Sequence, residues 1–504
     1  VAALSEPWGR PSSLASIGAR IVQNDAFIGE CLNRAARAWP HRLPAAELYG
    51  PAGLTGVSAN RLLTCLLEAA PAGSLKLERF LTLARYAMLD AIDPQLPVPD
   101  ADDAGLAFHA ALARQCWINE YVFDRTDAEL MKAHTLWDAL VTALEEKTSV
   151  PALWPVAVAA YFPLADLPYG ERLFDRVWPE PITALLVQQI REPGQERLYR
   201  QSLPHLTAIK DAVSLLVQRQ YEENPYPRWI KAAPACAPVT LDDSLRRTFP
   251  LAPLHPTSRR DRLDILVAGC GTGQHSLETA QRFVGARVLA IDLSLSSLSY
   301  AKRKTEELGV TTIEYAQADI VRMGSFGRSF DVIESSGVLH HLADPFAGWR
   351  TLLSLLRPNG CMRLGFYSKL ARRDISKIRS SMPVKGHPIT AESIRKRRQD
   401  IIEGQAQEQS GNVLLEDFFS LSGCRDLFFN VQEHCLTLID IKSFLYDHAL
   451  VFLGFCLDPK ILQDYRSCFP EDSAATNLTN WHYYELEHPD TFIEMYQFWV
   501  QKAG

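Results

Sequence analysis

The sequence predicts an α/β fold in which a Rossmann-like, mostly parallel sheet is joined to an all-helical N-terminal domain. In the first 205 residues the apolar side chains recur at helical spacing, as at Leu62, Leu66 and Ala69, without runs of alternating β-branched residues. From residue 261 onward, short β-branched runs alternate with helical segments, which is typical of a parallel α/β sheet. The 504 residues are long enough for about three domains.

The composition is that of an ordinary globular protein, with 47% apolar and 22% charged residues. The net charge of −7 does not favour nucleic acid as a partner. No two of the ten cysteines have C-x-x-C spacing, which favours a reducing, cytoplasmic location and disfavours a cysteine-based zinc site; we predict no metal. The longest apolar run, residues 150–165, is short and holds three prolines, so we expect no membrane span, and no targeting signal is visible.

The chain divides into five expected parts. They are an all-helical domain at 1–205, a linker and lid at 206–260, the Rossmann-like core at 261–368, an insertion over the active site at 369–436, and a completion of the sheet with a helical tail at 437–504. Within the linker, Pro225 and Pro227 end a helical stretch. Because no clean 34-residue period is present, a degenerate helical-repeat array and an irregular helical bundle both remain open for the first domain.

The expected core begins with a strand, a glycine-rich turn and a helix. Its five strands are expected at residues 264–268, 287–291, 312–316, 330–334 and 361–366. The first strand runs into a turn containing Gly269, Gly271 and Gly273. The second strand ends in Asp292, nineteen residues after Gly273, and the third leads to Asp319.

The order of these residues indicates an adenosine-like ligand. In an open α/β sheet, ligands bind beyond the carboxyl ends of the strands, where glycines let the backbone approach and a carboxylate accepts from ribose hydroxyls. The dinucleotide pattern G-x-G-x-x-G fails because Gln274 occupies its third glycine position, which disfavours NAD and FAD. No Lys-Ser or Lys-Thr pair follows the glycines, so the usual cradle for ATP is missing.

Residues 261–367 resemble the class I S-adenosylmethionine-dependent methyltransferases, a broad group that includes quinone-biosynthesis methyltransferases. The resemblance implies a seven-stranded sheet with S-adenosyl-L-methionine as cofactor. The glycines would border its methionine part, Asp292 would bind the ribose diol, and Asp319 with Ile320 would flank the adenine. The implied cofactor-binding residues are Gly269, Gly271, Gly273, Asp292, Leu293, Asp319, Ile320 and Ser335.

Two further resemblances concern the chain outside the glycine turn. The stretch from Ser335 to Pro345 is similar to the segment that follows the fourth strand in that family and faces cofactor and substrate. The wider chain resembles bacterial proteins that join a helical or tetratricopeptide-like region to this domain, through residues 115–121, 220–229 and 495–502. That architecture implies no single substrate.

Methyl transfer from a sulfonium is an in-line displacement, so the acceptor must first be aligned. A base is needed for an oxygen or protonated-nitrogen acceptor, and histidine suits this task near pH 7. The catalytic candidates are His340, His341, Tyr367 and His434. The candidates for a lid or for substrate contact are Tyr221, Tyr226, Trp229 and Glu433. Purely structural roles stay open for all of them: loop packing, capping of the sheet edge, interdomain packing or an ordinary surface pair.

Two segments stand out by composition alone. Residues 369–398 hold ten basic side chains and two acids, which would suit an acidic protein, a phosphorylated or carboxylated substrate or RNA, or would form a solvated helix face. Residues 481–499 hold seven aromatic side chains among acids, which favours core or interface packing over stacking on bases.

The resemblance therefore implies a methyltransferase, and we expect its acceptor to be a protein or peptide recruited by the helical domain, although the sequence does not decide between acceptor classes. A small molecule enclosed in a pocket is the alternative acceptor. A third hypothesis keeps the cofactor and makes the chain a non-catalytic adaptor or scaffold, which the intact glycines and both acids disfavour. We expect no membrane partner.

Overall fold

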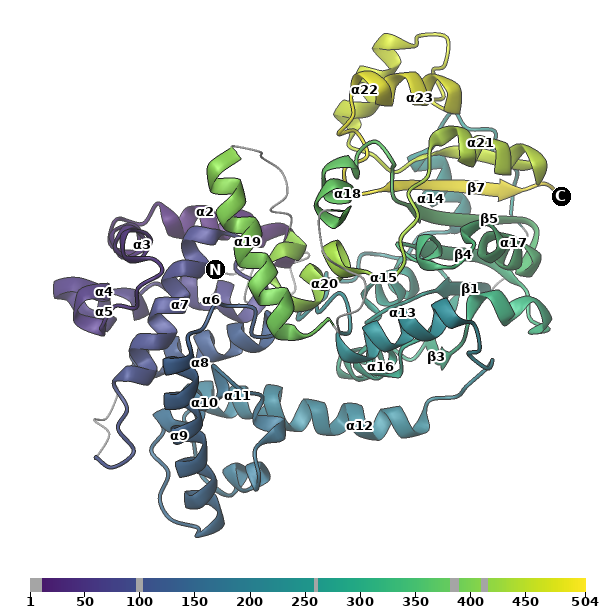
Figure 1. The fold of residues 1–504 in the computed structure, drawn as a ribbon. Coiled ribbons are helices and arrows are strands. Elements are labelled where there is room, and N and C mark those ends of the chain that lie inside the picture. Colours follow the sequence, from purple (N-terminus) through teal and green to yellow (C-terminus); the bar gives the residue numbers. More distant parts are fainter. Residues whose placement is uncertain (1–10, 97–102, 258–261, 381–388, 409–415) are drawn as a thin grey trace. The chain divides into compact units, whose positions relative to one another are not determined.

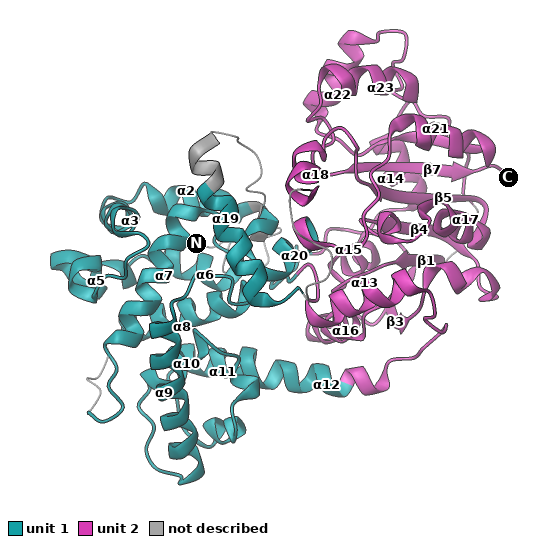
Figure 2. Ribbon diagram, viewed as in Figure 1, with its two compact units in different colours: residues 1–198, 228–234, 386–427 teal, residues 199–227, 235–385, 428–504 magenta. Residues whose placement is uncertain are grey.

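The computed structural model describes residues 11–96, 103–257, 262–380, 389–408 and 416–504, and Figure 1 labels its elements. The chain forms two compact units (Figure 2). We call residues 1–198, 228–234 and 386–427 the helical unit, and residues 199–227, 235–385 and 428–504 the sheet unit. The chain therefore passes between the units five times.

The helical unit contains no strand among its described residues, which confirms the all-helical prediction; a repeat array stays a prediction. Its helices are α2 (Pro11–Gln23), α3 (Ala26–Ala38), α4 (Ala45–Tyr49), α5 (Gly53–Ser58), α6 (Arg61–Ala69), α7 (Leu75–Asp90), α8 (Asp103–Ile118), α9 (Asp127–Glu145), α10 (Leu153–Ala159), α11 (Glu180–Leu186) and α19 (Ala391–Glu408), while α12 (Glu192–Ser202) and α20 (Leu421–Phe429) cross the division. Side chains begin several of them: Asp25 accepts from the Ile28 N–H, and Thr126 forms a capping box with Glu129. Of all helices within the described ranges, none has the length and apolarity to cross a bilayer.

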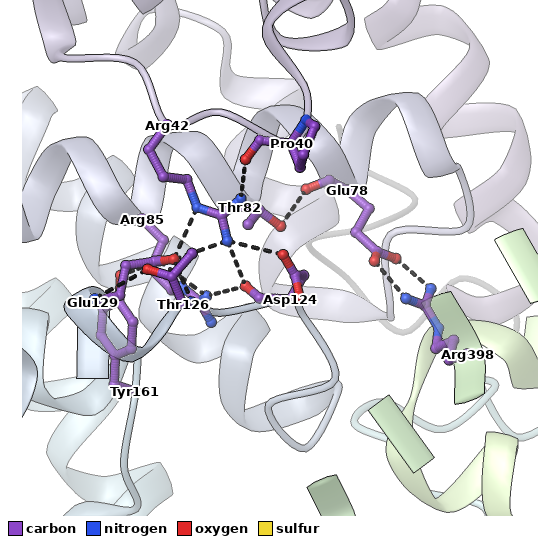
Figure 3. Close-up of polar contacts among 10 residues, drawn as sticks. All are labelled: Pro40, Arg42, Glu78, Thr82, Arg85, Asp124, Thr126, Glu129, Tyr161 and Arg398. Carbon is purple, nitrogen blue, oxygen red and sulfur yellow. Dashed lines mark hydrogen bonds and ion pairs between the residues drawn. The ribbon is translucent and has the colours of Figure 1, made fainter. Parts of the chain in front are cut away.

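A buried ionic network lies inside the helical unit (Figure 3). The Glu129 carboxylate accepts from Arg42 at 2.8 Å and from the Tyr161 hydroxyl at 2.9 Å, and it lies 3.5 Å from Arg85. Burial opposes ionisation of Glu129, but the positive charges of Arg85 and Arg42 outweigh it and hold its pKa below the usual range. Because removing one partner of such a pair costs about 3–5 kcal/mol, the network fixes α9 against α7.

A second buried ion pair joins α19 to α7 (Figure 3). Arg398 donates to both carboxylate oxygens of Glu78, at 2.6 and 2.5 Å, and its Nε donates to the Phe418 carbonyl at 2.7 Å. Residues 389–408 and 416–427 thus pack in the helical unit, although the sequence places them after the fifth strand of the sheet. The segment expected as one insertion at 369–436 is divided between the two units.

The sheet unit contains a seven-stranded sheet in the order β3-β2-β1-β4-β5-β7-β6. Its strands are β1 (Leu263–Ala268), β2 (Ala286–Asp292), β3 (Ile313–Gln317), β4 (Phe330–Ser336), β5 (Leu356–Phe366), β6 (Leu450–Phe455) and β7 (Tyr496–Lys502). β1 to β5 pair in parallel, and β7 pairs antiparallel with β5 and β6, which confirms the predicted mostly parallel, Rossmann-like sheet. The strand order reverses between β1 and β4, and ligands bind at such switch points.

Both faces of the sheet are covered by helices. Alternate strand residues point to opposite faces, so Leu266 of β1 packs in one core and Ile265 and Val267 in the other. The helices of this unit are α13 (Ala212–Glu223), α14 (Leu241–Thr248), α15 (Gln274–Arg282), α16 (Leu295–Glu307), α17 (Pro345–Leu355), α18 (Arg373–Ser380), α21 (Leu438–Asp447), α22 (Pro459–Cys468) and α23 (Leu478–Glu487). On one face, the Trp349 ring of α17 stacks on Phe444 of α21 with 3.9 Å between centroids. The loops that follow the strands therefore begin from a sheet whose position is fixed by packing on both faces.

Most basic side chains at residues 369–398 have acidic partners. Seven of the ten form ion pairs: Arg372 and Arg379 with Glu433, Arg373 with Asp490, Lys377 with Asp374, Arg395 with Glu392, Arg397 with Asp400, and Arg398 with Glu78. Lys385 lies outside the described residues. Ion pairing rather than an open basic surface accounts for most of the charge of this segment.

Candidate active site

The glycine turn after β1 requires glycine for two reasons. Gly269, Gly271 and Gly273 have φ of 76, 52 and 85°, a region that side chains rarely adopt. A Cβ at Gly271 would also lie 2.7 Å from the Tyr226 carbonyl oxygen, and a Cβ at Gly273 would lie 2.5 Å from the Ala301 Cβ. The turn at the carboxyl end of β1 therefore requires glycine both for its backbone conformation and for its close packing against neighbouring segments.

Asp292 ends β2 and holds the glycine turn. Its Oδ2 accepts from the Gly271 N–H at 2.8 Å and its Oδ1 accepts from the Ser294 N–H at 2.9 Å. Burial raises the pKa of the Asp292 carboxyl, although these two backbone donors act against the rise. A carboxylate has about four lone-pair positions, so about two remain for hydroxyl donors such as those of a ribose.

Asp319 follows β3 and is fully buried. Its Oδ1 accepts from the Val321 N–H at 3.2 Å, but its buried Oδ2 has no hydrogen-bond partner in the part of the chain that the structure describes. Burial raises the pKa of this carboxyl, and the nearby Ser214 hydroxyl offsets part of the rise. A buried acceptor without a donor is costly, and an amino group such as that of adenine would satisfy it.

The edge of the sheet beside Asp319 is covered by a segment that the sequence did not indicate. The Leu206 N–H donates to the Gln317 carbonyl and the Gln317 N–H donates to the Pro204 carbonyl, both at 2.9 Å. The Asp319 N–H donates to the Thr207 hydroxyl at 2.7 Å. Residues 204–207 therefore wall the place where a nucleoside would lie against β3.

The other implied cofactor residues also lie at this edge. The Leu293 carbonyl accepts from the Gln317 side chain at 2.8 Å, and Ile320, itself buried, begins a 3-10 turn. The buried Ser335 hydroxyl donates to the Ala268 carbonyl at 3.0 Å and so ties β4 to β1. The structure thus brings all eight implied positions to the carboxyl ends of β1 to β4, while their contacts with a ligand stay a prediction.

His340 and His341 lie in a short 3-10 turn (Leu339–His341) after β4. Their Nε2 atoms are 3.1 Å apart, and His341 Nδ1 lies 2.7 Å from the Gln432 carbonyl oxygen. A carbonyl can only accept, so His341 Nδ1 carries the hydrogen and, with both rings neutral, His340 Nε2 donates to His341 Nε2. This assigns an unprotonated Nδ1 to His340, and that buried atom has no partner among the described residues.

The surroundings of His340 keep it neutral. Burial lowers its pKa well below the usual value, and the nearby positive charges of Arg372 and Arg379 act in the same direction. Its ring stacks on Tyr367 with 4.0 Å between centroids, and the Arg372 guanidinium lies 3.6 Å from the Tyr367 centroid. A neutral imidazole with a free lone pair is the form that can accept a proton.

Glu433 holds both arginines. Arg372 donates to its two carboxylate oxygens at 3.2 and 3.0 Å, and Arg379 donates at 2.8 Å. The Glu433 side chain is only 4% exposed, so it is not an ordinary surface residue. Its neighbour His434 donates its backbone N–H to the His340 carbonyl at 2.8 Å.

Asn430 links Tyr221 to the histidine pair. Its amide donates to the Tyr221 hydroxyl at 3.2 Å and lies 3.5 Å from His341 Nε2. We call the following residues the histidine cluster: Tyr221, His340, His341, Tyr367, Arg372, Asn430, Glu433 and His434. The cluster unites all four catalytic candidates with two of the lid candidates.

The remaining lid candidates separate. Tyr226 stays beside the glycine turn, where its carbonyl faces Gly271, and the next carbonyl, of Pro227, accepts from the Thr272 hydroxyl. Trp229 is buried and belongs to the helical unit. Tyr221 and Tyr226 therefore belong to the sheet unit, whereas Trp229 belongs to the helical unit.

Sequence reasoning missed a buried acid in β4. Glu334 Oε2 accepts from the Thr279 hydroxyl at 2.6 Å and lies 2.6 Å from His275 Nε2, in the first turn of α15. Burial opposes its ionisation, but His275 and Arg363 lower the pKa of Glu334 to about 2. The pair ties the helix that follows the glycine turn to β4, and no local motif could have signalled it.

Other residues of the histidine cluster also lacked a signal. Arg372 was visible only as part of a basic run, and Asn430 lay in an unremarkable stretch. Their partners are distant in sequence, since 61 residues separate Arg372 from Glu433 and 209 separate Asn430 from Tyr221. Only the fold brings them together.

Comparison with known proteins agrees with this geometry. Residues 265–360 match the family model described as "Methyltransferase domain". An uncharacterized protein of Synechococcus is 27% identical over 335 residues, covering 61% of this chain and 76% of that protein. A ubiquinone biosynthesis O-methyltransferase of Cereibacter sphaeroides is 34% identical over 100 residues, covering 20% of this chain.

The chain spans only 39% of the length of the Cereibacter enzyme, so that similarity concerns one domain. Among solved structures, PKMT2 from Rickettsia typhi is similar at 15% identity with a TM-score of 0.39, over 51% of this chain and 52% of that one.

Proposed function

The chain carries a class I S-adenosylmethionine-dependent methyltransferase domain, and we propose that it uses this domain to methylate a protein or peptide recruited by the helical unit. S-adenosyl-L-methionine is the cofactor of that domain. The observation that carries the proposal is the pair of acids at the switch point. Asp292 retains lone pairs for a ribose, and Asp319 has a buried oxygen that lacks a donor.

Three parts of the sheet edge would hold the cofactor. Asp292 would accept from the ribose hydroxyls, and Asp319 Oδ2 would accept from the adenine amino group. The backbone of the glycine turn would lie along the methionine part, as ligands of open α/β sheets lie beyond the carboxyl ends of the strands. When bound, S-adenosylmethionine supplies an electrophilic methyl group on a sulfonium. The protein's own task is to align the acceptor and to exclude water.

His340 is the best-supported base for an acceptor that carries a proton. Its Nδ1 has a free lone pair, because its Nε2 hydrogen is directed at His341 and the His341 tautomer is fixed by Gln432. His341 and Tyr367 would then act as positioning residues that hold the His340 ring. Because burial keeps His340 in the neutral form, its Nδ1 could accept the proton of an O–H or N–H acceptor as the methyl group arrives.

The helical unit supports a protein or peptide acceptor. It makes up about half of the chain and contains none of the implied cofactor residues. Extended helical surfaces are well suited to binding peptides. The similarity to the Synechococcus protein covers 61% of the chain, far more than residues 265–360, which favours a role for the whole chain rather than for one domain.

One observation favours the alternative, a small-molecule acceptor. The His340 side chain is completely buried. A protein would have to present a thin side chain to reach Nδ1, whereas a small molecule could be enclosed around it.

Labelled methyl transfer tests the proposal. The chain is first titrated with S-adenosylhomocysteine in a calorimeter, and labelled S-adenosylmethionine is then added with a lysate of the source organism. We expect binding and a labelled protein band that is lost with Asp292→Asn. A labelled soluble metabolite would assign a small-molecule acceptor, binding without transfer would support an adaptor, and absence of heat would refute the cofactor site.

A reducing, cytoplasmic location remains part of the proposal. All ten cysteines are free thiols. Burial raises the pKa of Cys116 to about 11 and that of Cys361 to about 12, so these thiols are unreactive at neutral pH.

A further inference from the structure

The segment of residues 117–121, at the end of α8 and just beyond it, has an unusual backbone. We call it the anchor turn; it lies in the motif Gln115–Tyr121, for which the proposed reaction has no use. Glu120 and Tyr121 have φ of 57 and 59°, the left-handed region that residues other than glycine rarely adopt. Such a conformation persists only where the surroundings fix it, and it is often found at functional positions.

The anchor turn holds two segments that are far away in sequence. Glu120 Oε2 accepts from the Ser422 N–H at 2.6 Å, across 302 residues, and the Asn119 carbonyl accepts from the Leu421 N–H at 3.2 Å. Glu120 Oε1 lies 3.9 Å from the Arg228 guanidinium, which is stacked 4.6 Å from the Trp117 ring centroid. The buried Glu120 carboxylate therefore accepts a hydrogen bond from a backbone N–H in the first turn of α20, a group that has no partner within the helix. It also pairs with Arg228 at the start of the segment 228–234.

The segment before Arg228 reaches the glycine turn. Residues 226 and 227 belong to the sheet unit, where the Tyr226 carbonyl faces Gly271 and the Pro227 carbonyl accepts from Thr272. A single peptide bond separates these contacts from Arg228. The backbone that contacts the glycine turn is thus continuous in sequence with the residue that pairs with Glu120.

The segment after α20 reaches the histidine cluster. The helix ends at Phe429, and Asn430 follows with its hydrogen bond to Tyr221. The Val431 N–H donates to the Gln220 side chain at 3.1 Å, and the Gln432 carbonyl fixes the tautomer of His341. The residues that orient the candidate base are therefore the direct continuation of a helix that begins on Glu120.

We propose that Glu120 is a positioning residue for the cofactor turn and the histidine cluster, because it fixes the starts of both segments that carry their supporting contacts. The inference rests on the proposed methyltransferase function. It also gives a reason for the left-handed backbone conformation of Glu120, because in this conformation the carboxylate contacts both Arg228 and α20.

Hydrogen exchange and ligand binding of the full chain test this role. The variant is Glu120→Ala, and the matched control is Asp25→Ala, which also removes a carboxylate from a helix start but touches neither segment. We expect Glu120→Ala to speed amide exchange in peptides covering 426–434 and 220–227, without changing β1 or β2. We expect it to raise the Kd for S-adenosylhomocysteine about tenfold, whereas Asp25→Ala leaves the Kd within twofold.

Unchanged exchange in those two peptides would overturn the inference, and so would faster exchange with an unchanged Kd. If wild type binds no S-adenosylhomocysteine, the proposed function fails, and the exchange measurement alone still decides whether Glu120 holds the two segments. Glu120→Gln keeps an acceptor for Ser422 and should show a smaller effect. Together with Arg228→Met, it provides the test if Glu120→Ala does not fold.

Discussion

The two sides of the sheet's carboxyl edge are assembled differently. On the cofactor side, beyond β1 to β3, Asp292 is held by the backbone N–H groups of Gly271 and Ser294. On the histidine side, beyond β4 and β5, the His340–His341 pair is held by Gln432 and Asn430, which arrive from a distant part of the chain. The backbone donors that hold Asp292 are at most 21 positions away in sequence, whereas the residues that hold the histidine pair are 89 and 91 positions away.

The two sides also differ in charge. Burial raises the pKa of the carboxyls of Asp292 and Asp319, whereas burial and neighbouring arginines lower the pKa of His340. The acids thus require donors or a cation to stabilise their ionised form, while the histidine is kept ready to accept a proton. Substitutions of Asp292 or Asp319 should therefore alter cofactor binding, and substitutions of His340 should alter turnover.

Substituting His340 should separate the two sides most strongly. His340→Asn removes the candidate base and should lower kcat about 10²–10⁴-fold, the usual contribution of general base catalysis, while the Kd for S-adenosylhomocysteine stays within twofold. Steady-state kinetics with calorimetry measures both. His488→Asn, at an exposed position, is the control. A weakened Kd with unchanged kcat would reverse the assignment of the sides.

The contribution of Glu334, the buried acid of β4, to the stability of the fold should fall as the pH falls. The folded pKa of Glu334 is about 2, below the value of about 4.3 in an unfolded chain. This group stabilises the fold above about pH 4.3, and the stabilisation, on the order of 3 kcal/mol, is lost as the pH falls towards 2. Denaturant unfolding of the sheet unit between pH 2.5 and 6 should show this loss in wild type and a smaller one in Glu334→Gln. Parallel curves would argue against the His275–Glu334 pair.

Substituting Asp292 should loosen cofactor binding. Asp292→Asn keeps the size but replaces one acceptor by a donor that faces a backbone N–H, so the glycine turn and the ribose contact both suffer. We expect the Kd for S-adenosylhomocysteine to rise about 10- to 100-fold, since hydrogen bonds to charged groups contribute about 1.5–3 kcal/mol. Calorimetry measures this, and a Kd equal to wild type would remove Asp292 from the cofactor site.

The pH dependence of binding should show a smaller effect. A carboxyl with a raised pKa is protonated earlier as the pH falls and then loses acceptor capacity, so S-adenosylhomocysteine should bind more weakly at pH 5 than at pH 7.5. Asp319→Asn should reduce this dependence and weaken binding by about tenfold at pH 7.5, as expected for one hydrogen bond to a buried acid. Tighter binding at pH 5 would contradict the role of these acids.

The sequence predicted the cofactor side because its signals are short-range. The turn at 269–273 and the acids after two strands are visible as spacing, and strand pairing then places them together. β7 was harder to recognise, because Phe498 and Trp499 are buried on opposite faces and so hide the alternation of a strand. The anchor turn at Glu120 and the Arg372–Glu433 pair depend on contacts between residues hundreds or tens of positions apart, which no local pattern encodes.

The central claim is that Asp292 and Asp319 form a nucleoside site at the switch point of the sheet. A crystal structure of the full chain with S-adenosylhomocysteine tests it most directly. The account predicts ribose hydroxyls within hydrogen-bond distance of Asp292 and the adenine amino group at Asp319 Oδ2. Ligand bound elsewhere, or a nucleoside that leaves Asp319 Oδ2 without a donor, would contradict it.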